Sequence, residues 1–201
     1  MLRLGLTGGI ASGKSWVASL LREQGCQVLD ADQLAHQLIE PGHPAYEEVV
    51  REFGREILSP DGFVDRKKLG ALVFADAAKL AKLNAIVHPR VEEAINTQFE
   101  QWRAAGIRYA VFVEAALLVE AGMYKRLDGL VVVWCKPEQQ VERLRARGMS
   151  EEEARHRVAL QLPNEEKLKH ATYKIDCSGT REFTEAQVAA LAVKLRSAPT
   201  T

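Results

Sequence analysis

A glycine-rich stretch near the start of the sequence has a spacing that suits phosphate chemistry. Residues Gly8 to Ser15 read Gly-Gly-Ile-Ala-Ser-Gly-Lys-Ser, which fits the pattern G-x-x-x-x-G-K-[ST]. Glycines let such a loop curl so that successive N–H groups point at phosphate oxygens, and a helix beginning there adds its positive end. We expect Lys14 to reach the β- and γ-phosphates of ATP and Ser15 to bind Mg²⁺.

The segments on either side of the loop agree with this prediction. An apolar run, Leu2–Leu6, precedes it and a helical pattern, Trp16–Gln24, follows it, which favours phosphate binding over an ordinary glycine-rich turn. The predicted ATP-binding residues are Gly8, Gly9, Ala11, Ser12, Gly13, Lys14, Ser15, Trp16 and, further along, Arg147.

A carboxylate and two arginines are candidates for the rest of a phosphoryl-transfer site. Asp32 follows the second apolar run, where a carboxylate at the carboxyl edge of an α/β sheet can accept the proton of an attacking hydroxyl. Its alternative role is to cap a helix expected from Gln33. Arg143 and Arg147, one helical turn apart, either close over the phosphates or form surface ion pairs with nearby glutamates.

Two glutamates are candidates for a second metal-orienting group. Glu114 and Glu120 lie beyond the third apolar run, where P-loop folds place such a carboxylate. The alternative for each is a carboxylate at the start of a helix. The sequence leaves the choice between these readings open.

Five apolar runs predict the strands that position these residues: Leu2–Leu6, Gln27–Leu29, Tyr109–Val113, Leu130–Trp134 and Lys174–Ile175. Helical patterns between most of them predict a parallel sheet with crossover helices in an α/β fold. The gap 41–105 is mostly helical in pattern, interrupted at Pro41-Gly42, Ser59–Gly62 and His88-Pro89, and predicts a helical insertion. The charged segment 143–169 predicts either a solvated helix surface or a mobile lid.

Bulk composition narrows the class of protein. The 201 residues fit a single α/β domain, and the balance of 27 Lys and Arg against 27 Asp and Glu does not favour a nucleic-acid or membrane-surface partner. Three scattered cysteines predict a reducing compartment and no zinc site. Without a visible signal peptide or an apolar run of about 20 residues, we expect a cytoplasmic monomer or weak homo-oligomer with no membrane anchor.

Taken together, the chain resembles the dephospho-coenzyme A kinase family from Thr7 to about Gly179. Asp30-Ala-Asp32 resembles the family's D-A-D signature, and Ala115–Glu120 resembles its P-L-L-F-E segment. Other similar stretches are Gly62–Arg66, His88-Pro89, Gln140–Leu144 with Arg147, and the set Arg157, Gln161 and Lys167. Departures from the family pattern are Glu114, Ala116, Trp16, Thr172 and Cys177.

The resemblance implies a P-loop NTPase three-layer fold with a five-stranded parallel sheet. It implies phosphorylation of the ribose 3′-hydroxyl of dephospho-CoA, the last step of coenzyme A biosynthesis, with ATP and Mg²⁺. Asp32 is the implied base, and Lys14 and Arg143 are the implied catalytic cations. In this reading the acceptor is bound by Asp32 and by the 41–105 insertion, through Arg66 and His88 with Lys68 as a further candidate, and 143–169 forms the lid.

Two rival functions stay open. Another small-molecule kinase of the same architecture would differ only in its acceptor, a nucleotide or a hydroxy acid. A nucleotide-dependent switch would bind ATP without transferring phosphate, and such a protein has no need of a base such as Asp32. A switch GTPase is disfavoured because no asparagine begins an N-K-x-D motif.

Overall fold

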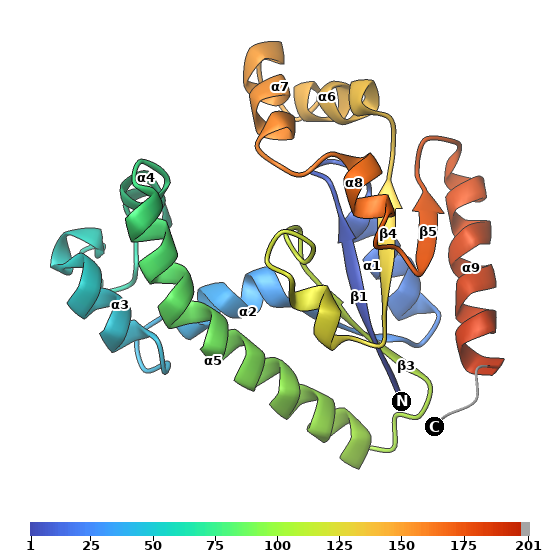
Figure 1. Ribbon diagram of the computed structural model, residues 1–201, viewed down its shortest axis with the longest axis horizontal. Coiled ribbons are helices and arrows are strands. Elements are labelled where there is room, and N and C mark those ends of the chain that lie inside the picture. The colour runs from blue at the N-terminus through green and yellow to red at the C-terminus, as the bar shows by residue number, and fades with distance from the viewer. Residues whose placement is uncertain (198–201) are drawn as a thin grey trace. The chain divides into compact units, whose positions relative to one another are not determined.

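The computed structural model describes residues 1–197, in which one or more helices separate each strand from the next along the chain (Figure 1). In chain order the elements are β1 (Leu2–Gly8), α1 (Lys14–Glu23), β2 (Gln27–Asp30), α2 (Ala31–Leu38), α3 (Tyr46–Phe53), η1 (Arg55–Ile57), α4 (Arg66–Phe74), α5 (Ala77–Ala104), β3 (Ala110–Glu114), η2 (Met123–Arg126), β4 (Gly129–Trp134), α6 (Pro137–Arg145), α7 (Glu151–Ala159), α8 (Asn164–Leu168), β5 (Tyr173–Asp176) and α9 (Arg181–Ser197). The chain divides into two compact units, residues 31–101 and the remainder.

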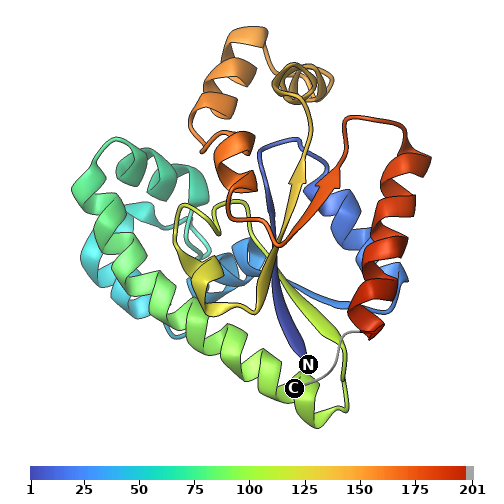
Figure 2. The same ribbon diagram turned by 45° about the vertical axis from the view of Figure 1, so that its right-hand side comes forward.

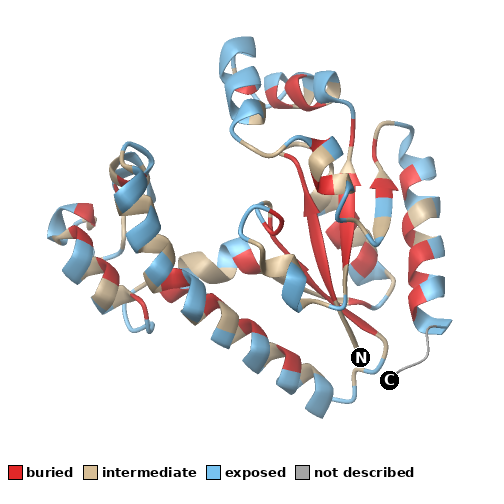
Figure 3. Ribbon diagram, in the orientation of Figure 1, coloured by how far each residue is buried: buried red, intermediate tan, exposed pale blue. Residues whose placement is uncertain are grey.

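The five strands form one parallel sheet in the order β2-β3-β1-β4-β5. The predicted parallel α/β sheet is therefore confirmed, with strand ends within two residues of the apolar runs. β1 is the central strand, and Figure 3 shows β1 and β4 buried along most of their length. Because β1 ends at Gly8, the glycine-rich loop leaves the sheet at the carboxyl edge of its central strand.

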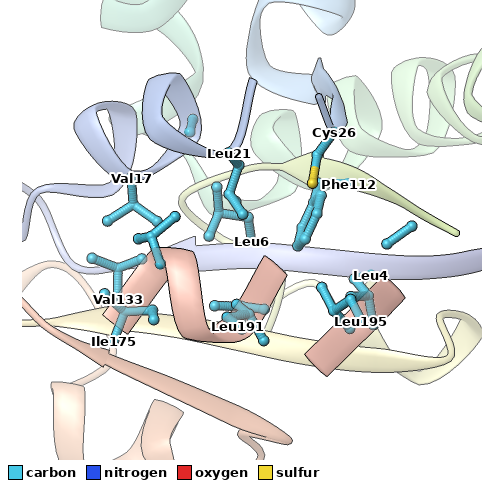
Figure 4. Packing of buried hydrophobic residues seen from close by; sticks show 14 of the residues in the cluster. Leu4, Leu6, Val17, Leu21, Cys26, Phe112, Val133, Ile175, Leu191 and Leu195 are labelled. Atoms are coloured by element: carbon cyan, nitrogen blue, oxygen red, sulfur yellow. The ribbon is translucent and has the colours of Figure 1, made fainter. Parts of the chain in front are cut away.

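Helices α1 and α9 cover one face of this sheet. Figure 4 shows Val17 and Leu21 of α1 with Leu191 of α9 packed around Leu6 and Val133 of the strands. α9 also lies beside β5 in both Figure 1 and Figure 2. Burying each leucine side chain of this cluster contributes roughly 1.5–3 kcal/mol, so this core holds the first strand and the first helix in place on both sides of the loop.

The opposite face is closed by the segment after β3 and by α8. A Cβ added to Gly5 would lie 2.8 Å from Leu130 Cδ1 and 3.1 Å from Leu118 Cδ1, so the side chains pack directly onto the β1 backbone. Thr7 Oγ1 donates to the carbonyl oxygen of Ala116 over 3.2 Å on this face. The sheet is thus covered on both faces, as the fold class requires.

The 31–101 unit is helical and has its own small core. Its buried apolar side chains are Leu38, Ile39, Ala45, Val49, Phe53, Ile57, Leu69, Val73, Val87, Val91, Ile95 and Phe99, with Ala31 at its start. Asp65 caps α4 by accepting from the N–H groups of Lys67 and Lys68. The expected turn at Ser59–Gly62 is present, and a β-bridge joins Leu58 to Val64 beside it.

Two local predictions differ from the structure. α5 runs from Ala77 to Ala104 through Pro89, so the expected interruption at His88-Pro89 is wrong; buried side chains on both sides of the proline hold the helix together against the lost hydrogen bond. α2 begins at Ala31, so Asp32 lies inside its first turn and does not cap a helix starting at Gln33. Within residues 1–197, no helix is long and apolar enough to cross a membrane.

Candidate functional site

The loop Gly8–Ser15, called the P-loop below, lines a cleft at the start of α1. The cleft has a volume of about 370 Å³, and its wall consists of Gly8–Trp16 together with Ala116, Arg147 and Gln161. Gly13 precedes α1 with a φ of 104°, which the absence of a Cβ permits. The first N–H groups of a helix have no intrahelical partner, so the cleft presents donors and a positive helix end to an anion.

Close packing fixes the path of the P-loop backbone. A Cβ at Gly8 would lie 2.3 Å from the carbonyl oxygen of Val133, and one at Gly9 would lie 2.5 Å from Gln140 Nε2. Neither glycine therefore tolerates a side chain without displacing its neighbours. Ala11 has a φ of 58° although it carries a Cβ, a conformation that needs support from the surroundings.

Lys14 is held by a carboxylate from the neighbouring strand β3. Its Nζ lies 2.8 Å from Glu114 Oε1, and Glu114 Oε2 lies 3.9 Å from Arg22 Nη2. The Glu114 side chain is 4% exposed, so the carboxylate is buried between two cations. Glu114 thus lies at the carboxyl edge of the sheet and contacts Lys14, the lysine that the sequence predicts to bind the phosphates.

Arg143, on α6, contacts the P-loop through backbone carbonyl groups. Its Nη1 donates to Ala11 over 3.1 Å and its Nη2 donates to Cys177 over 2.6 Å. The bond to Ala11 supports the loop at its non-glycine residue with a positive φ, and the bond to Cys177 ties the same guanidinium to the end of β5. In this structure the guanidinium therefore acts on the loop itself, and the predicted contact of Arg143 with phosphate stays a prediction.

A second cleft of about 370 Å³ lies next to the first. Both clefts are lined by Ala11, Gly13, Trp16 and Arg147, and the second is completed by Arg143, Cys177, Gly179 and Arg181. The Arg181 guanidinium lies 5.9 Å from the centre of the Trp16 ring. Burial raises the pKa of the Cys177 thiol to about 11, so the thiol adds no negative charge beside the arginines of this cleft at neutral pH.

Glu120 is engaged in a different pair. Its Oε1 lies 2.7 Å from Nζ of Lys167, whose side chain is fully buried and also donates to the carbonyl oxygen of Ala116 over 2.9 Å. This geometry joins α8 to the segment after β3. Of the two glutamates left open by the sequence, Glu114 is the one that contacts Lys14.

Three predicted acceptor-binding residues belong to the 31–101 unit. Asp32 is exposed in the first turn of α2, two residues after the end of β2. Arg66 is exposed at the start of α4, 3.8 Å from Glu40 Oε1, and His88 is exposed on α5. Lys68 Nζ donates to the Leu58 carbonyl. Their roles toward an acceptor stay predictions.

Two polar residues that bind the P-loop, and a third that supports one of them, were not assigned a role from the sequence. Gln140 and Gln161 bind the backbone of Ile10, and Asn164 binds Gln140. The motif positions of Gln140 and Gln161 were visible in the sequence, but not their contacts with Ile10, which lies 130 and 151 residues earlier. Arg157, which belongs to the same stretch, forms an exposed ion pair with Glu153 at 3.1 Å.

Comparisons with known proteins agree on one family. Residues 2–182 match the family model described as dephospho-CoA kinase. A dephospho-CoA kinase from Symbiobacterium thermophilum is 48% identical over 93% of this chain and 78% of its own length. The structure is similar to TT1252 from Thermus thermophilus, with a TM-score of 0.85 and 37% identity over 98% of both chains. It is also similar to dephospho-CoA kinase from Campylobacter jejuni, with a TM-score of 0.71 and 26% identity over 96% and 97% of the two chains.

Proposed function

The chain belongs to the dephospho-CoA kinase family, and from this premise we propose how its residues transfer phosphate from ATP to the ribose 3′-hydroxyl of dephospho-CoA. The protein is a phosphotransferase of coenzyme A biosynthesis that uses ATP and a hydroxyl acceptor.

The observation that carries the residue assignment is the cleft formed by the P-loop and the first turn of α1. Donor N–H groups, the helix end and Lys14 meet there, and these are the groups that stabilise charge spread over phosphate oxygens. Phosphoryl transfer requires mainly positioning and charge stabilisation from the protein. We assign Lys14 as a cation that binds the transferred phosphate. We assign Arg147, which lines both clefts, as a second cation that binds the phosphates of ATP.

Mg²⁺ fits the residues at the start of α1. The Ser15 side chain is exposed there beside Lys14, and Mg²⁺ is usually bound by one or two protein oxygens together with substrate phosphates. We assign Ser15 as the direct ligand and Glu114 as a carboxylate that orients metal-bound water. The ion would supply positive charge to the phosphate oxygens.

Asp32 is the proposed base. β2 ends at Asp30 on the sheet edge beside Glu114, and the two residues of chain that follow span at most about 7 Å. This short connection keeps Asp32 near the carboxyl end of β2, and α/β sheets present catalytic groups at the carboxyl ends of their strands. Its exposed carboxylate would accept the proton as the hydroxyl attacks.

The remaining assignments concern the acceptor and the cover of the site. We assign Arg66 and His88 of the 31–101 unit to dephospho-CoA, since a guanidinium suits an anionic pyrophosphate. We assign 143–169 as a lid with Arg143 as a catalytic cation, because excluding water prevents hydrolysis of ATP. We expect a cytoplasmic enzyme that works as a monomer or weak homo-oligomer without a nucleic-acid partner.

The test is an acceptor panel assayed with the purified protein, ATP and Mg²⁺. Dephospho-CoA, adenosine, nucleoside monophosphates and shikimate would be compared by ADP formation and by mass spectrometry of the products. Gain of one phosphate by dephospho-CoA alone supports the proposal. Transfer to a different acceptor would keep the mechanism and refute the substrate, whereas ATP binding without any transfer would favour the switch.

A further inference from the structure

Both backbone polar groups of Ile10, at the tip of the P-loop, are bound by glutamine side chains. The Ile10 N–H donates to Gln161 Oε1 over 2.6 Å, and the Ile10 carbonyl accepts from Gln140 Nε2 over 2.6 Å. Gln140 lies on α6, and Gln161 lies between α7 and α8. The two peptide units that flank the Ile10 Cα are therefore bound by side chains from two separate segments.

The hydrogen bond from Gln140 to the Ile10 carbonyl is made by a side chain with a fixed orientation. Gln140 is 4% exposed, and its Oε1 accepts from Asn164 Nδ2, which also donates to the Cys135 carbonyl over 2.9 Å. A buried amide whose groups are bonded in this way has a single favourable orientation. Gln140 thus holds the Ile10 carbonyl in one orientation.

Gln161 is half-buried and also lines the P-loop cleft, unlike Gln140. Its position is held by the next residue, because the Leu162 N–H donates to Glu120 Oε1 over 3.2 Å. Glu120 is in turn bound to the fully buried Lys167. The amide oxygen of Gln161 therefore reaches the cleft from an anchored backbone.

The conformation of the P-loop tip depends on support from these side chains. N–H groups stabilise phosphate well only when their directions are set before the ligand arrives. The Ile10-Ala11 tip contains no glycine, and Ala11 adopts a positive φ that disfavours a residue with a Cβ. Without its side-chain partners, this tip would relax toward other backbone conformations.

We propose that Gln161 is a positioning residue for ATP: by accepting the Ile10 N–H, its amide oxygen holds the tip of the P-loop in the conformation that directs the following N–H groups of the loop to the cleft. This inference rests on the proposed function in taking ATP as the ligand, and it adds a residue outside the G-x-x-x-x-G-K-S segment to the nucleotide site. It also makes the 160–164 segment part of the phosphate-binding surface. Gln161 acts through the P-loop and takes no part in the chemistry.

The test replaces Gln161 with leucine, which has similar size but no acceptor. Gln161→Leu is expected to raise both KM for ATP and the dissociation constant for ADP about tenfold, while KM for dephospho-CoA stays within about twofold. The melting temperature is expected to fall by no more than about 4 °C, since the side chain is only half-buried. ADP binding, measured by calorimetry without acceptor, isolates the nucleotide site from the acceptor assignment.

Two further variants complete the experiment. Gln161→Asn, whose shorter side chain keeps an amide but withdraws it from Ile10, should reproduce the nucleotide defect. Val193→Ala, at a side chain on α9 that is 62% exposed and lies outside both clefts, should leave nucleotide binding unchanged. Normal ADP affinity in both Gln161 variants overturns the proposal, and so does an equal loss for both substrates with a large drop in melting temperature, because that result indicates a purely structural role.

Discussion

Lys14 Nζ lies 2.8 Å from Glu114 Oε1, and the two side chains are 15% and 4% exposed. The P-loop lysine is thus already paired with a carboxylate at a site with little water. A nucleotide phosphate has to compete with Glu114 for this cation or share it. Removal of either partner alone leaves the other charge poorly compensated.

Replacing Lys14 tests the P-loop assignment. Lys14→Ala is expected to lower kcat/KM about 100- to 1000-fold, the scale for removing one charge-stabilising group. It should also lower the free energy of unfolding, since Glu114 loses its partner. The double variant Lys14→Ala/Glu114→Gln should regain stability in urea unfolding without regaining activity. Near-normal turnover in Lys14→Ala would contradict the assignment.

The Glu114 carboxylate is expected to affect both nucleotide and metal. Glu114→Gln keeps the shape but removes the charge, so ADP should bind more tightly without Mg²⁺ because Lys14 is released. The Mg²⁺ concentration for half-maximal activity should rise, since a group that orients metal-bound water is lost. Glu120→Gln is the matched control, because Glu120 pairs with Lys167 and should leave the Mg²⁺ dependence unchanged.

The Asp32 carboxylate is predicted to act in the chemical step. Asp32→Asn should lower kcat by about 10²- to 10⁴-fold while KM for ATP changes little, because the amide cannot accept the proton. Steady-state kinetics with both substrates varied provide the measurement. Asp30→Asn, at the last position of β2, serves as the control. Equal losses in kcat and ATP affinity would assign Asp32 a structural role.

The buried Lys167 is predicted to matter for stability. Lys167→Met should cost about 2–4 kcal/mol, somewhat less than a fully enclosed pair, because the Glu120 side chain stays 24% exposed. Lys169→Met is the matched control: its exposed pair with Glu166 should contribute below about 1 kcal/mol. Urea unfolding of both variants measures the difference. Similar free energies of unfolding would show that burial of Lys167 contributes nothing.

The raised pKa of the Cys177 thiol predicts how the free energy of unfolding changes at alkaline pH. Burial raises its pKa from 9.0 to about 11, so between these values the unfolded chain loses a proton that the folded chain keeps. The stability contributed by this thiol is therefore complete below pH 9 and is lost as the pH rises toward 11. The free energy of unfolding should fall more steeply across this range in the natural protein than in Cys177→Ala. Parallel curves would refute the effect of burial on this group.

Local sequence patterns were sufficient to predict the sheet and the P-loop. Continuous apolar runs such as Leu130–Trp134 are strands in the structure, and the glycine pattern from Gly8 lies at the junction of β1 and α1. Both features depend on neighbouring residues in the chain. The helix through Pro89 could not be predicted locally, because tertiary packing outweighs the cost of the proline.

The contacts of the candidate site were harder to predict, because they join distant segments. Arg143 carries a charge that suggests phosphate, yet in the structure it binds the backbone at Ala11 and Cys177. Gln140 and Gln161 lie at motif positions but carry no charge that would point to a partner, although they bind Ile10 directly. Spacing along the chain contains no information about which backbone groups need a partner in the folded state.

The strand order also determines when the nucleotide site can form during protein synthesis. β1 is made first, but its partners are β3 and β4: Leu2 pairs with Ala110 and Gly8 with Val133. Both partner strands of β1 are therefore available only after residue 133 has left the ribosome. The sequence of the 31–101 unit is complete earlier. A nascent chain that is released before β4 is finished would contain the entire P-loop sequence and still lack the sheet that shapes it.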